Sequence, residues 1–448
     1  MKAAMRLTTV PAGNKVRPMT PGTFYPSETD MSSVRTRYTD SVNFFGNTTP
    51  QALLQQFGSP LYVYNETILR ERCRELLALS GYPGFRVCFS GKANANLSLL
   101  KIIREAGLCA DAMSPGELAL QLAAGFAPED LVYVCNNVSA EEMKNAVDRG
   151  LLLSLDSLDQ LETFGKHFPG NKIMVRLNPG IGAGHHQKVI TAGAKTKFGV
   201  RGDEFDELHT ILATYSLKLA GINQHIGSLF MEAGPYLEAV EWLLETATLF
   251  QGLEVIDFGG GFGIPYRKYE DEPRLDMAEL GNKLDALLQE WSAKHAYTGK
   301  FVIEPGRYAT AECGLVLGTV QATKRNGDIH FVGTDIGFNV LSRPMLYDSF
   351  HDIEIYREGT GPQADSQEQT VVGNICESGD ILAKDRKLPV IETGDSIAML
   401  DAGAYGFSMA SPYTQRLRPA EVLVQADGSV KLIRRRETIE DVMRLFPE

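Results

Sequence analysis

The sequence lacks an apolar run long enough to cross a membrane, a long run of basic residues and any C-x-x-C pair. A membrane-spanning helix needs ~20 consecutive apolar residues, and no stretch of the chain approaches that length. Residues 1–30 contain no apolar core of the kind that a signal peptide carries. We therefore expect a soluble, cytoplasmic protein with no membrane partner.

Charge and cysteine content exclude further classes of protein. The 44 Lys and Arg residues are outnumbered by 56 Asp and Glu residues, and the net charge of −12 disfavours nucleic acid as a partner. The six cysteines are scattered without zinc-like spacing, which argues against a disulfide scaffold and favours a reducing compartment. His185 and His186 stand in a glycine-rich stretch without a carboxylate cluster, so we expect no metal site.

What the chain does have is an alternation of short apolar runs and amphipathic segments between residues 61 and 312. Eight strand-like runs occupy residues 85–90, 108–113, 131–135, 151–156, 172–178, 219–227, 255–261 and 301–305. The segments between them have helical periodicity; Leu99, Ile102 and Ile103, for example, share one helical face. The alternation predicts an α/β fold with a closed (β/α)8 barrel, and a doubly wound open sheet is the alternative.

Polar residues stand at the carboxyl ends of nearly all these predicted strands. They are Lys92, Asp111, Asn136, Asp156, Asn178, His225, Gly259–Gly261 and Glu304. The carboxyl ends of barrel strands converge on one mouth, which is where barrel enzymes hold their active sites. The pattern therefore predicts an active site at this mouth.

After residue 313 the pattern changes to strand-like runs separated by turns, with little helix. These runs lie at residues 314–325, 330–338, 370–380, 395–406, 420–428 and 430–437, and residues 357–369 form a polar stretch typical of a loop. They predict a second, mostly antiparallel β domain. We assign residues 61–312 to the barrel domain and 313–448 to the β domain. Residues 1–60 form an N-terminal extension that adds one or more strands to the β domain.

The first predicted strand runs straight into a lysine, in VCFSGKAN (87–94). An exposed, salt-bridged lysine is the ordinary explanation, and a lysine held in the barrel mouth for carbonyl chemistry is the alternative. No carboxylate neighbours Lys92 in the sequence. This isolation suits an amine that must at times be neutral.

Three further motifs follow late strands. The glycines of GGGFG (259–263) let backbone N–H groups approach an anion, although a plain turn has equal weight and the lysine of a nucleotide-binding loop is missing. In EPGR (304–307), the glutamate suits a protonated ring nitrogen and the arginine suits a carboxylate or phosphate, with a structural salt bridge as the alternative. In HIGS (225–228), the histidine suits stacking on an aromatic ring and the serine suits a phosphate, although a lone histidine is more often a core residue.

The predicted β domain carries three motifs of its own. CESGD (376–380) sets a cysteine beside a glutamate, which suits a proton donor with a substrate-binding neighbour; an inert buried cysteine is the alternative. SRPMLY (342–347) spaces an arginine and a tyrosine for an anionic group, and DAGAYG (401–406) places a tyrosine among glycines. Together the motifs supply a lysine, a ring-stacking histidine, phosphate-binding glycines, a carboxylate for a pyridinium nitrogen and arginines. These are the parts of a pyridoxal phosphate site.

These motifs, in this order, resemble those of the fold-type III pyridoxal phosphate-dependent decarboxylases, most closely the members that act on meso-diaminopimelate. The resemblance extends over about residues 50–445 and includes FSGKANAN (89–96). It implies an alanine racemase-like barrel with a β domain. It also implies an enzyme, a carboxy-lyase that converts meso-2,6-diaminopimelate to L-lysine and CO2 in the last step of lysine biosynthesis.

The resemblance further implies a role for each matching residue. The expected cofactor-binding residues are Lys92, which carries the cofactor covalently, Asp111, His225, Ser228, Gly260, Glu304, Gly306, Arg307 and Tyr405, with Glu117 supporting the ring on the side of Asp111. The expected substrate-binding residues are Arg307, Arg343, Tyr347, Glu377 and Tyr405. The expected catalytic residues are Lys92 and Cys376, and Cys376 returns a proton to the substrate. In this family Cys376 and Glu377 would enter the site of the other subunit, so a homodimer with shared active sites is expected.

Two alternatives to this function remain open. One is a related decarboxylase that acts on another diamino acid or on a carboxylated polyamine or siderophore precursor. It is suggested by SPYTQRLRP (411–419), where the family often has Ser-Asn-Tyr-Asn, and by the long N-terminal extension. The other is a cofactor-carrying protein without turnover, which the motifs of the β domain argue against.

Overall fold

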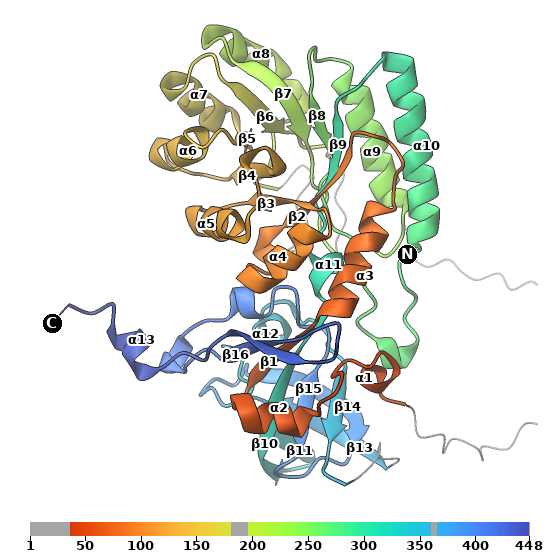
Figure 1. Cartoon of the computed structure of the whole chain (residues 1–448), viewed down its shortest axis with the longest axis vertical. Coiled ribbons are helices and arrows are strands. Elements are labelled where there is room, and N and C mark those ends of the chain that lie inside the picture. The colour runs from red at the N-terminus through yellow and green to blue at the C-terminus, as the bar shows by residue number, and fades with distance from the viewer. Residues whose placement is uncertain (1–35, 181–195, 360–364, 448) are drawn as a thin grey trace, which may run out of the picture.

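The eight predicted strands close into a parallel barrel. A computed structural model describes residues 36–180, 196–359 and 365–447, and Figure 1 shows the barrel above a second sheet. The barrel strands are β2 (Phe85–Ser90), β3 (Cys109–Ala112), β4 (Leu131–Cys135), β5 (Leu152–Leu155), β6 (Lys172–Arg176), β7 (Lys218–Asn223), β8 (Val255–Asp257) and β9 (Lys300–Ile303). Pairing of β2 with β9 completes the ring, so the (β/α)8 prediction is confirmed and the open sheet is wrong.

Helices surround this barrel, and several of them begin at short polar residues. They are α3 (Glu66–Leu77), α4 (Leu97–Glu105), α5 (Pro115–Ala124), α6 (Ala140–Val147), α7 (Leu158–His167), α8 (Phe205–Thr214), α9 (Gly234–Ala247), α10 (Met277–His295) and α11 (Arg307–Thr310). Asn96, Ser114, Ser139 and Ser157 cap α4 to α7, each accepting a backbone N–H from the first turn. Each cap fixes where a strand-to-helix loop ends. The loops between strand and cap then hold polar side chains at the barrel mouth.

The second sheet is mixed but mostly antiparallel, as predicted. Its strands are β1 (Leu61–Asn65), β10 (Gly314–Asn326), β11 (Ile329–Thr334), β12 (Ile353–Tyr356), β13 (Ser366–Val372), β14 (Ile381–Pro389), β15 (Ser396–Met399), β16 (Ala420–Val424) and β17 (Val430–Arg434). They are ordered β14-β13-β11-β10-β1-β16-β17, with β15 on β10 and β12 on β15. The parallel pairs are β1 with β16 and β11 with β13. The short helices of this region are α1 (Tyr38–Ser41), α2 (Pro50–Phe57), α12 (Arg343–Tyr347) and α13 (Ile439–Met443).

Some details of this sheet differ from the sequence-based expectation. Residues 366–369, expected in a loop, begin strand β13, where they pair with β14. Strand β1 starts at residue 61, the predicted first residue of the barrel domain, but it pairs with β10 and β16 of the sheet. The domain boundaries themselves stay predictions. No helix in the described ranges is both long and apolar enough to cross a membrane.

A buried cluster of charges joins the barrel to the β domain. Lys268, in the 3-10 turn Lys268–Glu270, donates to both carboxylate oxygens of Asp401 at 2.9 Å and lies 3.3 Å from Glu312. The side chains of Asp401 and Glu312 are almost fully buried. Arg274 also pairs with Glu312 at 2.5 Å. Burial first, and then Glu312, raise the pKa of Asp401 to about 7, while Lys268 opposes the rise.

Replacing Lys268 with methionine should lower the free energy of unfolding by about 3 kcal/mol, because it leaves buried carboxylates short of a cation. Equilibrium urea unfolding measures the change. The matched control is Lys283→Met, which removes an exposed pair with Glu279 and should cost under about 0.5 kcal/mol. Equal losses in the two variants would show that the cluster adds nothing beyond a surface pair.

Candidate active site

A cavity of about 250 Å³ lies at the carboxyl ends of the barrel strands, where the barrel meets the β domain. Its lining comprises Ser90, Lys92, Asp111, Met113, Val134, Asn136, Arg176, Phe198, Asn223, His225, Ser228, Gly261, Glu304, Gly306, Arg307, Arg343, Tyr347, Tyr405 and Met409. Ten of these residues were expected to bind the cofactor or the substrate. They are Lys92, Asp111, His225, Ser228, Glu304, Gly306, Arg307, Arg343, Tyr347 and Tyr405. The folded chain therefore brings together residues that lie far apart in the sequence.

Lys92 reaches into this cavity from a 3-10 turn, Gly91–Ala93, that directly follows β2. Its side chain borders the open space of the cavity and is exposed there, although the cavity lies within the protein. Burial alone would lower the pKa of Lys92, but the charges of Asp111, Tyr405 and Glu304 outweigh burial and raise it. The expectation of a lysine isolated from carboxylates is therefore wrong, because strands β3 and β9 deliver carboxylates that are distant in sequence.

Asp111 and Glu117 lie on the same side of the cavity as Lys92. Asp111 is 1% exposed and its Oδ1 accepts the backbone N–H of Gly91 at 3.1 Å. Burial and the neighbouring Glu304 raise its pKa to about 7, against the opposing effect of Lys92. Glu117 accepts the N–H of Met113 at 2.8 Å and does not line the cavity. It thus supports the loop after β3 from behind.

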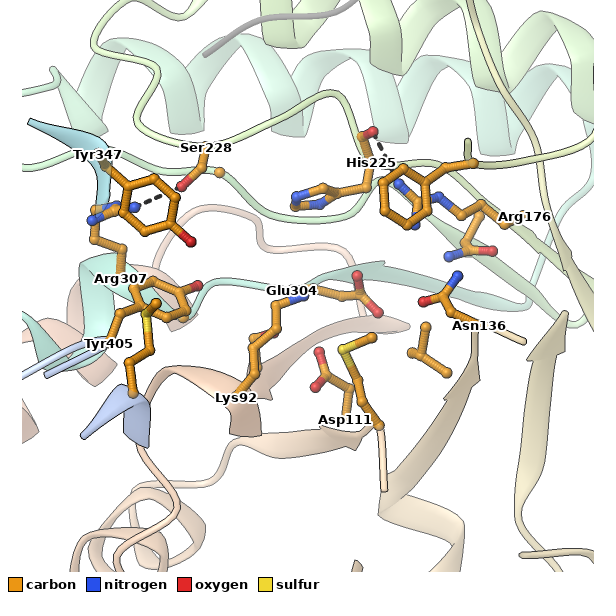
Figure 2. A pocket seen from close by; sticks show the side chains of 18 of the residues that line it. Lys92, Asp111, Asn136, Arg176, His225, Ser228, Glu304, Arg307, Tyr347 and Tyr405 are labelled. Atoms are coloured by element: carbon orange, nitrogen blue, oxygen red, sulfur yellow. Dashed lines mark hydrogen bonds between the residues drawn. The ribbon is translucent and has the colours of Figure 1, made fainter. Parts of the chain in front are cut away.

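His225 follows β7, and its ring faces Lys92 across the cavity (Figure 2). Its Nδ1 accepts the N–H of Gly260 at 3.1 Å, which fixes the neutral tautomer with hydrogen on Nε2. Burial, Lys92 and Arg176 lower the pKa of His225 well below its usual value. Gly260 therefore orients the histidine rather than lining the cavity. It is the next glycine, Gly261, that lines it.

The glycine run permits a backbone approach that other residues would block. A Cβ on Gly260 would lie 1.9 Å from the carbonyl oxygen of Glu304, and Gly261 has φ of +111°. Both positions therefore require glycine. Glu304 is tied to the same loop, because its N–H donates to the carbonyl of Gly259 at 2.9 Å. The loop and the carboxyl group of Glu304 are thus held in one fixed arrangement.

Two buried arginines form the cationic end of the cavity. Arg307 donates to Ser228 Oγ at 2.9 Å and to the hydroxyl of Tyr266 at 2.7 Å. Arg343 donates to the same hydroxyl at 2.9 Å. These guanidinium groups are 5% and 2% exposed, and neither pairs with a carboxylate of the described ranges. Tyr405 stacks near Arg307, with 5.1 Å between the guanidinium carbon and the ring centroid.

Cys376 and Glu377 lie elsewhere. Both are exposed in the β domain, and neither lines the cavity of its own chain. Glu377 accepts the hydroxyl of Tyr413 at 2.5 Å. The exposure of Cys376 rules out the inert buried cysteine considered above. His185 and His186 fall outside the described residues.

Several residues in the cavity or bonded to its lining were not expected from the sequence. Arg176 ends β6 inside the barrel, and its guanidinium lies 4.5 Å from the ring centroid of Phe198. Tyr266 bridges the two arginines from a loop after the glycine run. A charged residue at the end of an otherwise apolar strand was the available signal for Arg176. No local pattern distinguishes Tyr266, because its role depends on two arginines distant in sequence.

The residues present fit pyridoxal phosphate. Ser228, Gly261, Gly306 and the two arginines give hydroxyl, backbone and cationic groups at one end of the cavity, which suit a phosphate and a carboxylate. Glu304 supplies a carboxyl group for a ring nitrogen, and Lys92 an amine for an aldehyde. The neutral His225 presents a ring face between them.

Comparison with known proteins gives a consistent result. The family model for the pyridoxal binding domain of pyridoxal-dependent decarboxylases matches residues 68–311. The diaminopimelate decarboxylase of Methanothermobacter thermautotrophicus is 41% identical over 401 residues, covering 88% of this chain and 92% of that protein. The enzyme of that name from Escherichia coli K12 is 33% identical, over 87% and 94%. The crystal structure of diaminopimelate decarboxylase from Helicobacter pylori complexed with L-lysine matches with a TM-score of 0.81 at 29% identity, over 89% and 99%.

Proposed function

Because the chain belongs to the pyridoxal-dependent decarboxylases, we propose that it removes CO2 from meso-2,6-diaminopimelate and releases L-lysine. Its cofactor is pyridoxal 5'-phosphate, and its reaction is that of a carboxy-lyase in lysine biosynthesis. We further propose that the enzyme works in the cytoplasm as a homodimer. Relatives named diaminopimelate decarboxylase favour this substrate over other diamino acids and over a carrier role without turnover.

The pair of buried arginines is the observation that carries the proposed substrate. Burying a guanidinium group without a carboxylate partner is costly, and the cost is recovered when an anion binds. Ser228 and Arg307 are proposed to take the cofactor phosphate, with Gly261 and Gly306 contributing backbone around it. The carboxylate at the far end of the substrate is proposed to be bound by Arg343 and Tyr347, together with Arg307. A substrate with two amino acid ends supplies that carboxylate, whereas ornithine does not.

The other cofactor contacts follow from the geometry of the cavity. Lys92 is proposed to hold the cofactor covalently, Glu304 to accept a hydrogen bond from its ring nitrogen, and neutral His225 to cover one face of the ring. Asp111 and Tyr405 contact the cofactor from the side of Lys92. When bound, pyridoxal phosphate supplies an electron sink for the electron pair that the departing carboxylate leaves behind.

Two residues are proposed to act on the substrate directly or through the cofactor. The Lys92 amine would hold the cofactor in the absence of substrate and would be released from it while the substrate is bound. The thiol of Cys376 donates the proton that replaces CO2 on the substrate carbon. Since Cys376 and Glu377 lie outside the cavity of their own chain, we propose that they reach the cavity of a second subunit. Glu377 would bind the ammonium group at the far end of the substrate.

Incubation of the purified protein with pyridoxal phosphate and meso-diaminopimelate should release CO2 and L-lysine in equal amounts. Ornithine, lysine and a carboxylated polyamine should react with kcat/KM at least about a hundredfold lower, because each lacks a group that the cavity binds. Gas release and amino acid analysis measure both products. A preference for the polyamine would select the related decarboxylase instead, and cofactor binding without any CO2 would select the carrier.

A further inference from the structure

Asp257, the last residue of β8, pairs with Val302 of β9, two residues before Glu304, and is used by none of the steps above. It is 0% exposed, and its Oδ1 accepts the N–H of Gly259 at 2.8 Å. Its Oδ2 is buried, as is Oε1 of Glu304, and no hydrogen-bond donor of the described residues reaches either oxygen. Both residues are bonded to Gly259, whose carbonyl accepts the N–H of Glu304 at 2.9 Å and whose N–H donates to Asp257. A direct hydrogen bond between their carboxyl groups requires a proton on one of them, because two ionised carboxylates are acceptors only.

The surrounding charges explain why one of these carboxyl groups is protonated. Four carboxyl groups, of Asp111, Asp156, Asp257 and Glu304, lie around the two cations Lys92 and Arg176. Burial first, and then the charge of Glu304, raise the pKa of Asp257 well above its usual value. Arg176 interacts with Asp257 as well as with Asp156 and Glu304, and the remaining titratable groups that interact with Asp257, Tyr236 of α9 and Cys88 of β2, supply no positive charge. The cations are therefore too few for all four carboxyl groups to be ionised.

We propose that Asp257 is a protonated carboxylic acid that donates its O–H to Glu304 and positions it for the ring nitrogen of the cofactor. The proton resides on Asp257 rather than Glu304 because Asp257 is fully buried outside the cavity, whereas Glu304 lines the cavity together with Lys92. The N–H of Gly259 occupies Oδ1 and leaves Oδ2 to carry the hydrogen. Asp257 is thus a positioning residue, and this role rests on the proposed function.

The consequence is a single, fixed negative charge at the floor of the cavity. A second ionised carboxylate at Asp257 would repel Glu304 and bind a proton in competition with the ring nitrogen. A neutral acid instead donates one hydrogen bond, which orients Glu304. Asparagine reproduces this arrangement, because its Oδ1 can accept from Gly259 while its Nδ2 donates to Glu304.

The kinetic test compares two variants of nearly equal size. Asp257→Leu removes the donor and should lower kcat by about tenfold or more, with KM within about twofold of the parent, since Asp257 does not line the cavity. Asp257→Asn should restore kcat to within about twofold and keep the absorbance spectrum of the bound cofactor. If Asp257 were an ionised partner of Arg176, the asparagine variant would lose activity as the leucine variant does, and the proposal would be overturned.

Infrared spectroscopy tests the proton itself and needs no substrate. The full-length protein, with and without cofactor, should show the carbonyl band of a buried carboxylic acid. The band should persist at a pH well above 7, because the pKa values of Asp111 and Asp401 are both about 7 and these two groups are then ionised. The band should disappear in Asp257→Asn. It should also disappear in Glu304→Gln, whose amide donates to Asp257 and lets it ionise. Absence of the band in the parent, or its persistence in Asp257→Asn, would refute a protonated Asp257. A protein that shows the band yet releases no CO2 would refute the proposed function alone.

Discussion

Alanine in place of Lys92 is expected to lower kcat by at least on the order of a thousandfold and to abolish the absorbance of lysine-bound cofactor. Lys92 lies within reach of the groups proposed to bind the cofactor, and the described lining of the cavity contains no second lysine. Because its side chain projects into the cavity rather than the core, the variant should fold normally. Absorbance spectra and steady-state turnover of the same preparation measure the two effects together.

Lys101→Ala is the matched control, because Lys101 is exposed on α4, the helix that follows the same strand. It should retain both the absorbance and the turnover of the parent. Loss of the Lys92 charge also removes the effect that opposes the raised pKa of Asp111, so that pKa should rise above about 7 in Lys92→Ala. Full turnover in Lys92→Ala would show that another amine carries the chemistry.

The barrel could be predicted from the sequence because its strands carry a local signal. Runs such as 85–90 and 131–135 are apolar, bounded by turns and spaced by amphipathic helices, and they match β2 and β4 residue for residue. The β domain carries a weaker signal. Strands β12 and β14 were not expected, because β12 has only four residues and β14, at the edge of the sheet, contains four charged residues in a row, 384–387. The partners of β1 could not be inferred, since they lie more than two hundred residues further along the chain.

The candidate site, too, has features that could be predicted from the sequence and features that could not. Residues at strand ends, such as Lys92 and Glu304, could be found because a barrel brings all carboxyl ends to one mouth. Their charge environment could not be found, because the carboxylate that most raises the pKa of Lys92 comes from Asp111 on the next strand. The bridge of Tyr266 between two arginines and the effect of Glu304 on the pKa of Asp257 are likewise products of packing. Sequence spacing predicts which element carries a residue, but not which side chains it meets.

Cys376→Ala should bind cofactor with the absorbance of the parent but lose about a hundredfold or more in kcat, because the thiol is the proposed proton donor to the substrate. Cys376 is exposed and outside the cavity of its own chain, so its loss should leave the fold and the contacts of Lys92 intact. Cys109→Ala, which removes a thiol at the opposite opening of the barrel, is the control and should remain active. Equal activity in Cys376→Ala would show that another group supplies the proton.

Mixing the two inactive variants tests whether the site is shared between subunits. In a dimer with one Lys92→Ala chain and one Cys376→Ala chain, one site combines an intact Lys92 with an intact Cys376 from the other chain, and the second site has lost both. If subunits exchange at random, half of the dimers are mixed and half of their sites are complete, so about a quarter of the parent activity should return. If each chain formed its site alone, no site in any mixture would be complete and no activity would return. Recovery therefore requires that Cys376, exposed on its own chain, act in the cavity of its partner.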